Sequence, residues 1–300
     1  MEAQISDVVP TLRRGSGESA PERMRTARNR RRIALLASAC AALGLHAPAS
    51  AQTLDNKYWV SAMAFFPKVD TDVRVATKTQ ADIGTDIDFE KDLALDKDEI
   101  LPSFTAGARF GRVVVGADFY KLNRNGQIGL ARDISFDGVV YPATAQVRSG
   151  FDSEIYRLTV GYAFVQNSTV ELGAAIGAHV TRFEMSLSGV GTVGGVTGQS
   201  EVRRRNVLAP LPTIGAFVTY KVAPRVELNG RFDWLSLKVD DYDGRLLNAQ
   251  VGANYAVAKN LQLGVAYRYV DYRLGIDKER WDGRVRYKLH GPAVQLQASF

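Results

Sequence analysis

His179 is the residue whose setting most suggests catalysis in this sequence. A histidine can act as the general base for a hydroxyl nucleophile that lies within hydrogen-bond reach. In the segment AHVTRFE, Thr181 follows two residues after His179 and shares its face of an extended strand, whereas Glu184 falls on the other face. No serine stands at position 181, which argues against a hydrolytic pair. We therefore predict no catalytic residue, no metal site and no cofactor.

Charged side chains at alternate positions along the chain form the second candidate site. If they face one enclosed interior, opposite charges can pair and close it, because buried charges are tolerated when they are paired. Arranged as opposed rings, the same charges would instead select small ions or solutes that pass through. Both interpretations concern four arginines, four acids and one histidine, namely Arg109, Asp118, Arg157, Glu171, His179, Glu227, Arg231, Asp233 and Arg268.

Strict alternation of apolar and polar residues defines the elements that must position these side chains. Between residues 261 and 269, leucine, valine and tyrosine at odd positions alternate with Gln262, Gly264, Ala266 and Arg268. Successive side chains of a strand point to opposite faces, so such a segment has one apolar and one more polar face. Ten segments show this pattern, near 57–69, 99–110, 112–123, 150–165, 168–186, 202–221, 224–238, 243–257, 260–274 and 283–300.

The connections between these segments alternate in length. Short turns lie at 110–112, 165–168, 221–225 and 258–260, and the mostly longer, more polar stretches are 70–98, 124–149, 187–201, 239–242 and 275–282. Short periplasmic turns and longer extracellular loops are the layout of a membrane-spanning barrel. We predict an all-β chain that forms a closed antiparallel transmembrane β-barrel of about ten strands, with eight strands as the alternative.

A soluble barrel would also alternate, but it would place its apolar side chains inside. Aromatic residues near the ends of the apolar rows, such as Phe104, Phe110 and Tyr255, favour lipid outside, because membrane barrels carry aromatic girdles at both interfaces. Glycines crowd the polar face, which suits a narrow interior. His290 shares a face with Phe300 and is therefore expected at a membrane interface.

The last segment, GPAVQLQASF, ends on an aromatic residue that apolar residues precede at alternate positions. Phe300, Ala298, Leu296 and Val294 form this row, with glutamines between them. The row is similar to the terminal signature of outer-membrane barrels, and residues 57–300 resemble the small outer-membrane β-barrel proteins of Gram-negative bacteria. The resemblance implies assembly by the barrel assembly machinery, which reads that signature, and contact with outer-membrane lipid and lipopolysaccharide.

The same resemblance supplies an alternative function, because some small outer-membrane barrels are enzymes. A lipid A deacylase-like hydrolase would use a His–Ser pair with an acid, and an omptin-like protease would use acidic pairs with a His–Asp pair. In this chain such a hydrolase would depend on His179. We expect instead a monomeric, non-enzymatic outer-membrane protein: either a narrow, porin-like channel for small solutes or a structural or surface barrel.

An export signal precedes the barrel. Arginines at 25, 28 and 30–32 form a basic region, residues 33–45 are apolar, and Ala49-Ser50-Ala51 is a cleavage site of the A-x-A type. We predict a signal peptide at 24–51 that is cleaved after Ala51, and a barrel domain at 52–300. Residues 1–23 are too polar for a signal, so we expect them to be untranslated or disordered, with Met24 as the start.

The basic excess of the chain lies mostly in this leading part. The sequence has 38 Lys and Arg against 32 Asp and Glu, and residues 1–51 hold eight of the former and four of the latter. Because the rest is nearly balanced, we exclude nucleic acid as a partner. Cleavage after Ala51 would also remove Cys40, the only cysteine, and with it any disulfide or thiolate chemistry.

Two polar stretches of the predicted loops remain. The acidic connection 70–98 is expected to be a solvated surface loop rather than a divalent-cation site, since it lacks the spacing of an EF-hand loop. The arginines at 203–205 are either a contact for lipopolysaccharide phosphates, which Arg binds well, or an ordinary basic strand end.

Overall fold

The computed structural model describes residues 54, 56–78, 84–193, 196–197, 201–279 and 281–300. The predicted extension 1–23 and signal segment 24–51 lie outside the described residues, so the structure does not bear on them. None of the described residues belongs to a helix long and apolar enough to cross a membrane.

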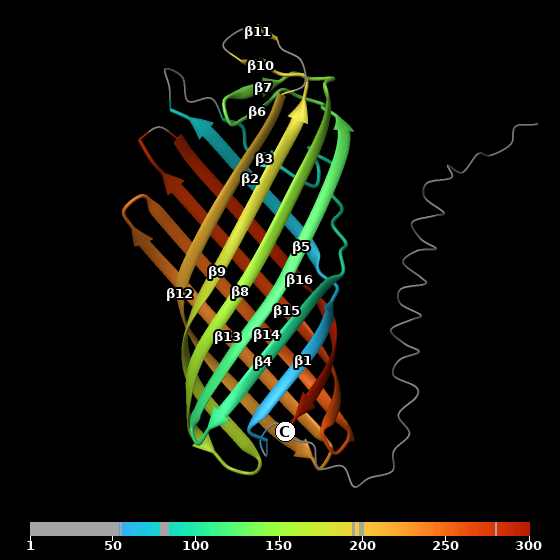
Figure 1. Cartoon of the computed structure of the whole chain (residues 1–300), viewed down its shortest axis with the longest axis vertical. Coiled ribbons are helices and arrows are strands. Elements are labelled where there is room, and N and C mark those ends of the chain that lie inside the picture. Colours follow the sequence, from blue (N-terminus) through green and yellow to red (C-terminus); the bar gives the residue numbers. More distant parts are fainter. Residues whose placement is uncertain (1–53, 55, 79–83, 194–195, 198–200, 280) are drawn as a thin grey trace, which may run out of the picture. The chain divides into compact units, whose positions relative to one another are not determined.

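Ten antiparallel strands form one closed barrel, which confirms the predicted fold and the higher of the two strand counts. Each wall strand pairs with its neighbours along the chain, and β1 closes the ring by pairing with β16 (Figure 1). The wall consists of β1 (Tyr58–Phe65), β4 (Leu101–Phe110), β5 (Val113–Gly129), β8 (Gln146–Gln166), β9 (Val170–Gly189), β12 (Glu201–Ala223), β13 (Val226–Val239), β14 (Tyr242–Ala258), β15 (Leu261–Asp277) and β16 (Trp281–Ser299).

The first wall strand is kinked where β1 passes into β2 (Lys68–Thr77). The strand β2 continues the pairing with β16, but only β1 pairs with β4. The backbone passes very close to Gly291 at the kink: a Cβ atom on that glycine would lie 2.2 Å from the carbonyl oxygen of Phe66. Beyond the kink, β2 runs beside a segment that returns from the first long connection, with the amide of Val69 donating to the carbonyl of Lys97 at 2.9 Å.

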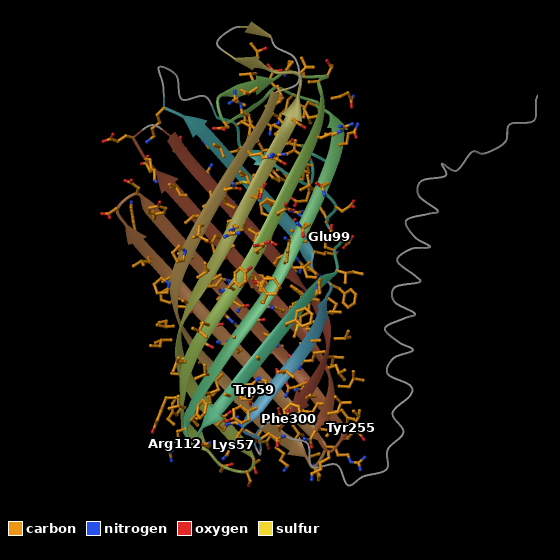
Figure 2. All side chains as sticks on the ribbon, viewed as in Figure 1. Lys57, Trp59, Glu99, Arg112, Tyr255 and Phe300 are labelled. Atoms are coloured by element: carbon orange, nitrogen blue, oxygen red, sulfur yellow. The ribbon has the colours of Figure 1, made fainter. Side chains whose placement is uncertain are left out.

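The lipid-facing surface is the outward, apolar row of each strand. Large hydrophobic side chains on this row are 40–68% exposed in most cases, which is the reverse of a soluble protein. Aromatic side chains lie near both ends of the row, and Tyr255 and Phe300 mark the end that carries the short turns, called here the turn end (Figure 2). The opposite end is called the loop end.

Many strands extend well beyond this apolar band. The strands β8, β9 and β12 have 21, 20 and 23 residues, about twice the 9–11 residues that cross a bilayer. The predicted long loops are therefore too long at their ends, because the strands continue into them; the first loop, for example, begins after Thr77 rather than at residue 70. The small strands near the loop end are β3 (Ile87–Asp88), β6 (Ile134–Phe136), β7 (Val139–Tyr141), β10 (Thr192–Val193) and β11 (Val196–Thr197).

The apolar face changes sides along the strands. On β15, Leu263, Val265 and Tyr267 point outward and are exposed, whereas Tyr272 and Leu274 nearer the loop end point inward and are buried. Beyond the apolar band, toward the loop end, the outward positions are mostly charged or polar, such as Asp271 and Arg273. The barrel thus has lipid outside and polar residues inside near the turn end, and polar residues outside with an apolar core near the loop end.

Candidate functional site

The structure places all nine predicted interior residues on the inward face of the wall. They come from β4, β5, β8, β9, β13 and β15. Eight of them are at most 8% exposed, and Arg231 is partly exposed. Alternation fixes this orientation, since each stands one residue away from an outward, lipid-facing neighbour.

Five of these residues form one hydrogen-bonded cluster across the barrel, which we call the central ion network: Asp118, Arg157, Arg231, Asp233 and Arg268. Arg157 joins its two carboxylates, donating to Asp118 at 2.8 Å and to Asp233 at 2.7 Å. Because Asp118 lies on β5 and Asp233 on β13, this single guanidinium links strands that do not pair with each other.

The other two arginines complete the network. Arg268 on β15 donates to Asp118 at 3.3 Å and lies 4.4 Å from the ring centroid of Tyr120. Arg231 donates to Asp233 at 3.0 Å, and Asn248 donates to the same carboxylate at 3.1 Å. Three cations and two carboxylates therefore neutralise most of each other's charge, as buried charges require.

A second ion pair lies nearer the turn end. Arg109 on β4 donates twice to Glu171 on β9, at 2.9 and 2.7 Å. Its guanidinium lies 5.6 Å from the ring centroid of Trp59, and it also donates to the carbonyl of Asn56 at 2.8 Å. The bidentate geometry is the strongest form of an arginine–carboxylate contact. Glu227, the remaining predicted acid, is also buried.

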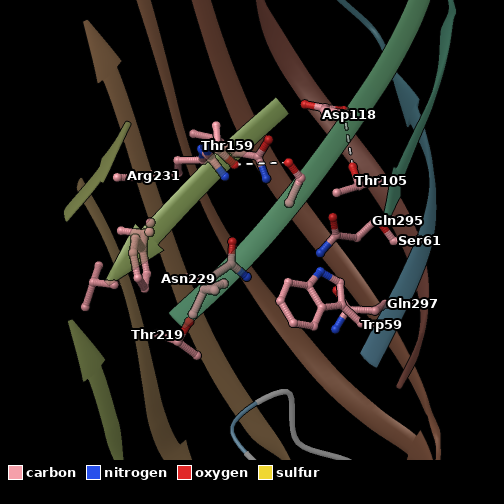
Figure 3. A pocket seen from close by; sticks show the side chains of 18 of the residues that line it. Trp59, Ser61, Thr105, Asp118, Thr159, Thr219, Asn229, Arg231, Gln295 and Gln297 are labelled. Carbon is pink, nitrogen blue, oxygen red and sulfur yellow. Dashed lines mark hydrogen bonds between the residues drawn. The ribbon is translucent and has the colours of Figure 1, made fainter. Parts of the chain in front are cut away.

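Between the two ionic clusters the barrel encloses a polar cavity of about 170 Å³ (Figure 3). Its lining includes Trp59, Asn229 and Gln297, and the central ion network supplies part of its wall. Figure 3 also shows Thr105 donating to Asp118, at 3.2 Å. The volume is below the roughly 300–1,000 Å³ of ordinary small-molecule sites.

An apolar core fills the barrel on the loop-end side of the network, and the expectation of a polar interior is wrong for this half. Phe151 and Phe183 stack against each other with ring centroids 5.8 Å apart, and Tyr287 lies 5.3 Å from Phe151. Together with Tyr272 and Phe89 they form the aromatic cluster, whose members come from β8, β9, β15, β16 and the first long connection. The cluster crosses the lumen from wall to wall.

Part of the first long connection lies inside this core, and the prediction of a solvated loop is wrong for it. Phe89, Leu93 and Leu95 are 1–3% exposed. We call residues 84–98 the inserted segment. Ile87 and Glu90 are buried as well. The remaining residues are exposed or half-buried, half of them are acidic, and they alone resemble the predicted surface loop.

A buried ion pair anchors the inserted segment. Arg124 on β5, which is fully buried, donates to Glu90 at 2.5 Å, and Glu90 also accepts the backbone N–H of Thr71 at 2.8 Å. Arg132 donates to Asp92 at 2.6 Å on the surface. Burial of Asp88 disfavours its charged form, but hydrogen bonds from Lys91 outweigh this effect and lower the pKa of Asp88.

Gly126 on β5 provides the space in which the inserted segment docks. A Cβ atom at this position would lie 2.2 Å from the carbonyl oxygen of Leu93, closer than any real contact. A glycine is required here by the close approach of two backbones rather than by an unusual φ angle.

The two histidines of the described residues lie in different surroundings. His179 is 1% exposed and Thr181 is 0% exposed, both on the inward face of β9. His290 lies on the outer surface, where its Nδ1 is 3.2 Å from the hydroxyl of Tyr267. Among the described residues, no group of three His, Cys, Asp or Glu side chains could hold a metal ion. Arg204 is exposed on the outer face of β12, and Arg203 is half-buried.

The five members of the central ion network are among the residues predicted to lie inside, whereas the aromatic cluster and the anchor pair were missed. The aromatic cluster has a signal in the sequence, because the alternating apolar row on β15 moves from odd positions to even positions after Tyr269. Glu90 carried no such signal, since it is one of several acids in the same connection.

Comparisons with known proteins give one matching family and several similar structures. A family model described as the outer membrane protein beta-barrel domain matches residues 37–288. The crystal structure of the outer membrane protease OmpT from Escherichia coli is similar, with 14% identity and a TM-score of 0.54, over 83% of this chain and 98% of that one. The translocator domain of the autotransporter NalP from Neisseria meningitidis has 12% identity and a TM-score of 0.41, over 93% and 97% of the two chains. No curated protein sequence matches the chain closely enough to count as a relative.

Proposed function

The chain belongs to the outer membrane protein β-barrel domain family. On that premise we propose that it is a closed, non-conducting barrel that holds a rigid head at the cell surface. The head is the loop-end half of the barrel, with its apolar core and the inserted segment. The family and the fold place the protein in the outer membrane. The observation that carries the proposal is that two different fillings block the lumen, one above the other. Of the two functions expected from the sequence, this favours the structural or surface barrel over the narrow channel.

The first filling is the central ion network. Arg157 spans the lumen with hydrogen bonds of 2.7 and 2.8 Å to carboxylates on two different strands. In a conducting pore the charged side chains would face water and would be available to contact a passing ion, rather than being paired with one another. Here each carboxylate already accepts hydrogen bonds from two arginines, and Arg268 is 2% exposed.

The second filling is the apolar core at the loop end. The inserted segment contributes Phe89, Leu93 and Leu95 to it, and the Glu90–Arg124 pair holds that segment in place. An ion crossing this layer would have to leave water entirely, which is several kcal/mol unfavourable for a charged group. The exposed residues of the head, rather than the lumen, are then the part of the protein that meets its surroundings.

We also propose that the protein is not a hydrolase. His179 and Thr181 lie inside the occluded lumen, where neither a lipid nor a peptide can reach them. The similarity to OmpT, at 14% identity, concerns the fold alone.

Single-channel conductance in a planar lipid bilayer tests the proposal. Protein purified from the membranes of expressing cells is expected to insert without reproducible conductance steps. Insertion itself is checked by recovery of folded, heat-modifiable protein from the same bilayer lipid. Gly126→Ala, which crowds the carbonyl of Leu93, is expected to loosen the inserted segment but to leave the central ion network closed.

Steady steps of uniform size from the wild-type protein would overturn the closed-barrel proposal and support the narrow channel. Steps from Gly126→Ala alone would mean that only the inserted segment closes the lumen, and the ion network would then be permeable.

A further inference from the structure

Three arginines form a row on the outer surface of neighbouring strands. Arg245 on β14 is the direct cross-strand partner of Arg273 on β15, and Arg273 is the direct partner of Arg286 on β16. All three are exposed on the outward face. Strands in a sheet lie about 4.8 Å apart, so the three side chains start within roughly 10 Å of one another.

The row carries charge that the protein itself does not neutralise fully. Arg273 has a carboxylate partner, Asp271, at 3.1 and 2.9 Å. Arg286 has Asp72 as its register partner on β2, while Arg245 lies beside Ser236 on β13. Like charges directly opposite each other in a sheet are destabilising, so a bound anion would be favoured here.

The row lies at the level expected for lipid headgroups. The next outward residues toward the turn end are Asp271 and Lys288, followed by Tyr269 and His290, and then by the apolar band. Four residues of strand separate Arg273 from Tyr269, about 13 Å along the strand and about 10 Å along the barrel axis for a usual tilt. Lys288 reaches back toward the membrane, with its Nζ 5.5 Å from the ring centroid of Tyr269.

On the opposite side of the barrel, formed by β5, β8 and β9, the outward charges at this level are paired. There the outward charges just beyond the apolar band pair with one another: Lys121 donates to Glu154 at 2.7 Å, and Arg182 approaches the same carboxylate at 3.7 Å. Basic residues on that side therefore have carboxylates beside them at the level of the headgroups, while the row on β14–β16 has an excess of cations.

We propose that Arg245, Arg273 and Arg286 bind a phosphate of an anionic lipid headgroup in the outer leaflet. The planar guanidinium presents paired N–H donors that match phosphate oxygens, and three such groups on adjacent strands can converge on one phosphate. The apolar band directly below accommodates the acyl chains of the same lipid. This site is independent of whether the barrel conducts.

The test is titration of the folded protein, in a zwitterionic detergent, with bisphosphorylated lipid A, followed by native mass spectrometry. The double variant Arg245→Gln, Arg286→Gln keeps the Arg273–Asp271 pair and removes two phosphate contacts. It is expected to bind about tenfold more weakly or worse, because hydrogen bonds to charged groups contribute at least that factor. The matched control is Arg148→Gln, Arg225→Gln, two exposed arginines on β8 and in the turn before β13, and it is expected to bind within about twofold of wild type.

Three outcomes would overturn the proposal. Equal losses in the two double variants would show a diffuse effect of net charge rather than a site. Unchanged binding of the same lipid after removal of its phosphates would show that the acyl chains alone are recognised. Competition by millimolar inorganic phosphate as strong as by the lipid would assign the row to free phosphate, not to a headgroup.

Discussion

Replacing Asp118 by asparagine tests whether the central ion network stabilises the barrel by charge pairing. The substitution keeps the size of the side chain and one hydrogen-bond acceptor, but it removes the negative charge that Arg157 contacts at 2.8 Å and Arg268 at 3.3 Å. Asp233 then remains as the only carboxylate in the network for three guanidinium groups. Removing one partner of a buried ion pair destabilises proteins by about 3–5 kcal/mol.

The size of this effect is large against the stability of a typical domain, about 5–15 kcal/mol. It can be measured by urea unfolding in lipid vesicles, followed by the intrinsic fluorescence of Trp59, Trp234 and Trp281 in the wall strands. Asp118→Asn is expected to lower the unfolding midpoint while leaving the slope m unchanged, since the surface exposed on unfolding stays the same.

A double-mutant cycle separates charge from packing. Arg268→Met alone leaves Asp118 with Arg157, so the loss should be smaller than for Asp118→Asn. Adding Arg268→Met to Asp118→Asn removes a cation that has lost its carboxylate, and the double variant should be at least about 1 kcal/mol more stable than the sum of the single changes predicts. Glu154→Gln, which removes a 2.7 Å ion pair on the outer surface, is the control and should leave the midpoint unchanged. A loss below about 1 kcal/mol for Asp118→Asn, or strictly additive effects, would refute this account.

Three further changes probe the loop-end half and the histidine. Glu90→Gln removes the carboxylate partner of buried Arg124 and should raise amide hydrogen exchange across residues 84–98 without changing the turn-end strands; unchanged exchange would mean that Leu93 and Leu95 hold the segment without the ion pair. Phe151→Ala should lower the free energy of unfolding in urea by about 3–5 kcal/mol, because the ring is fully buried; a loss under 1 kcal/mol would mean that the aromatic cluster is not tightly packed. His179→Ala should leave lipid A acylation and outer-membrane peptide cleavage in cells unchanged, and a change in either would revive the hydrolase alternative.

The barrel itself could be predicted because its strands alternate over long stretches. The outward row Leu263, Val265 and Tyr267 fixes which face of β15 meets lipid, and the neighbouring strands repeat the pattern. The inward orientation of residues such as Arg268 follows from the same alternation. The ten predicted segments each correspond to one wall strand, and most of them stop short of the observed strand on the loop side.

The contacts between inward side chains could not be predicted, because they depend on the stagger of strands around the barrel. Alternation places Arg157 inside, but which carboxylates it meets depends on how β5, β8 and β13 are shifted relative to one another. The buried role of Glu90 depends in addition on the path of the inserted segment. Such tertiary placement leaves no periodic trace in the sequence.

The change of apolar face along the strands explains why the charged layer lies where it does. Near the turn end, lipid surrounds the wall. Apolar side chains would gain little hydrophobic free energy by pointing inward rather than toward lipid, so the interior can be polar there. Beyond the membrane, water surrounds the wall, and only an apolar interior supplies the hydrophobic stabilisation of an ordinary domain. Arg268 lies at the change between the two, with its guanidinium between the carboxylate of Asp118 and the ring of Tyr120. In a sequence of this kind the apolar residues of several strands pass from odd to even positions, or the reverse, at the same depth in the barrel. This pattern therefore predicts both a surface head with its own apolar core and an ionic layer beneath it.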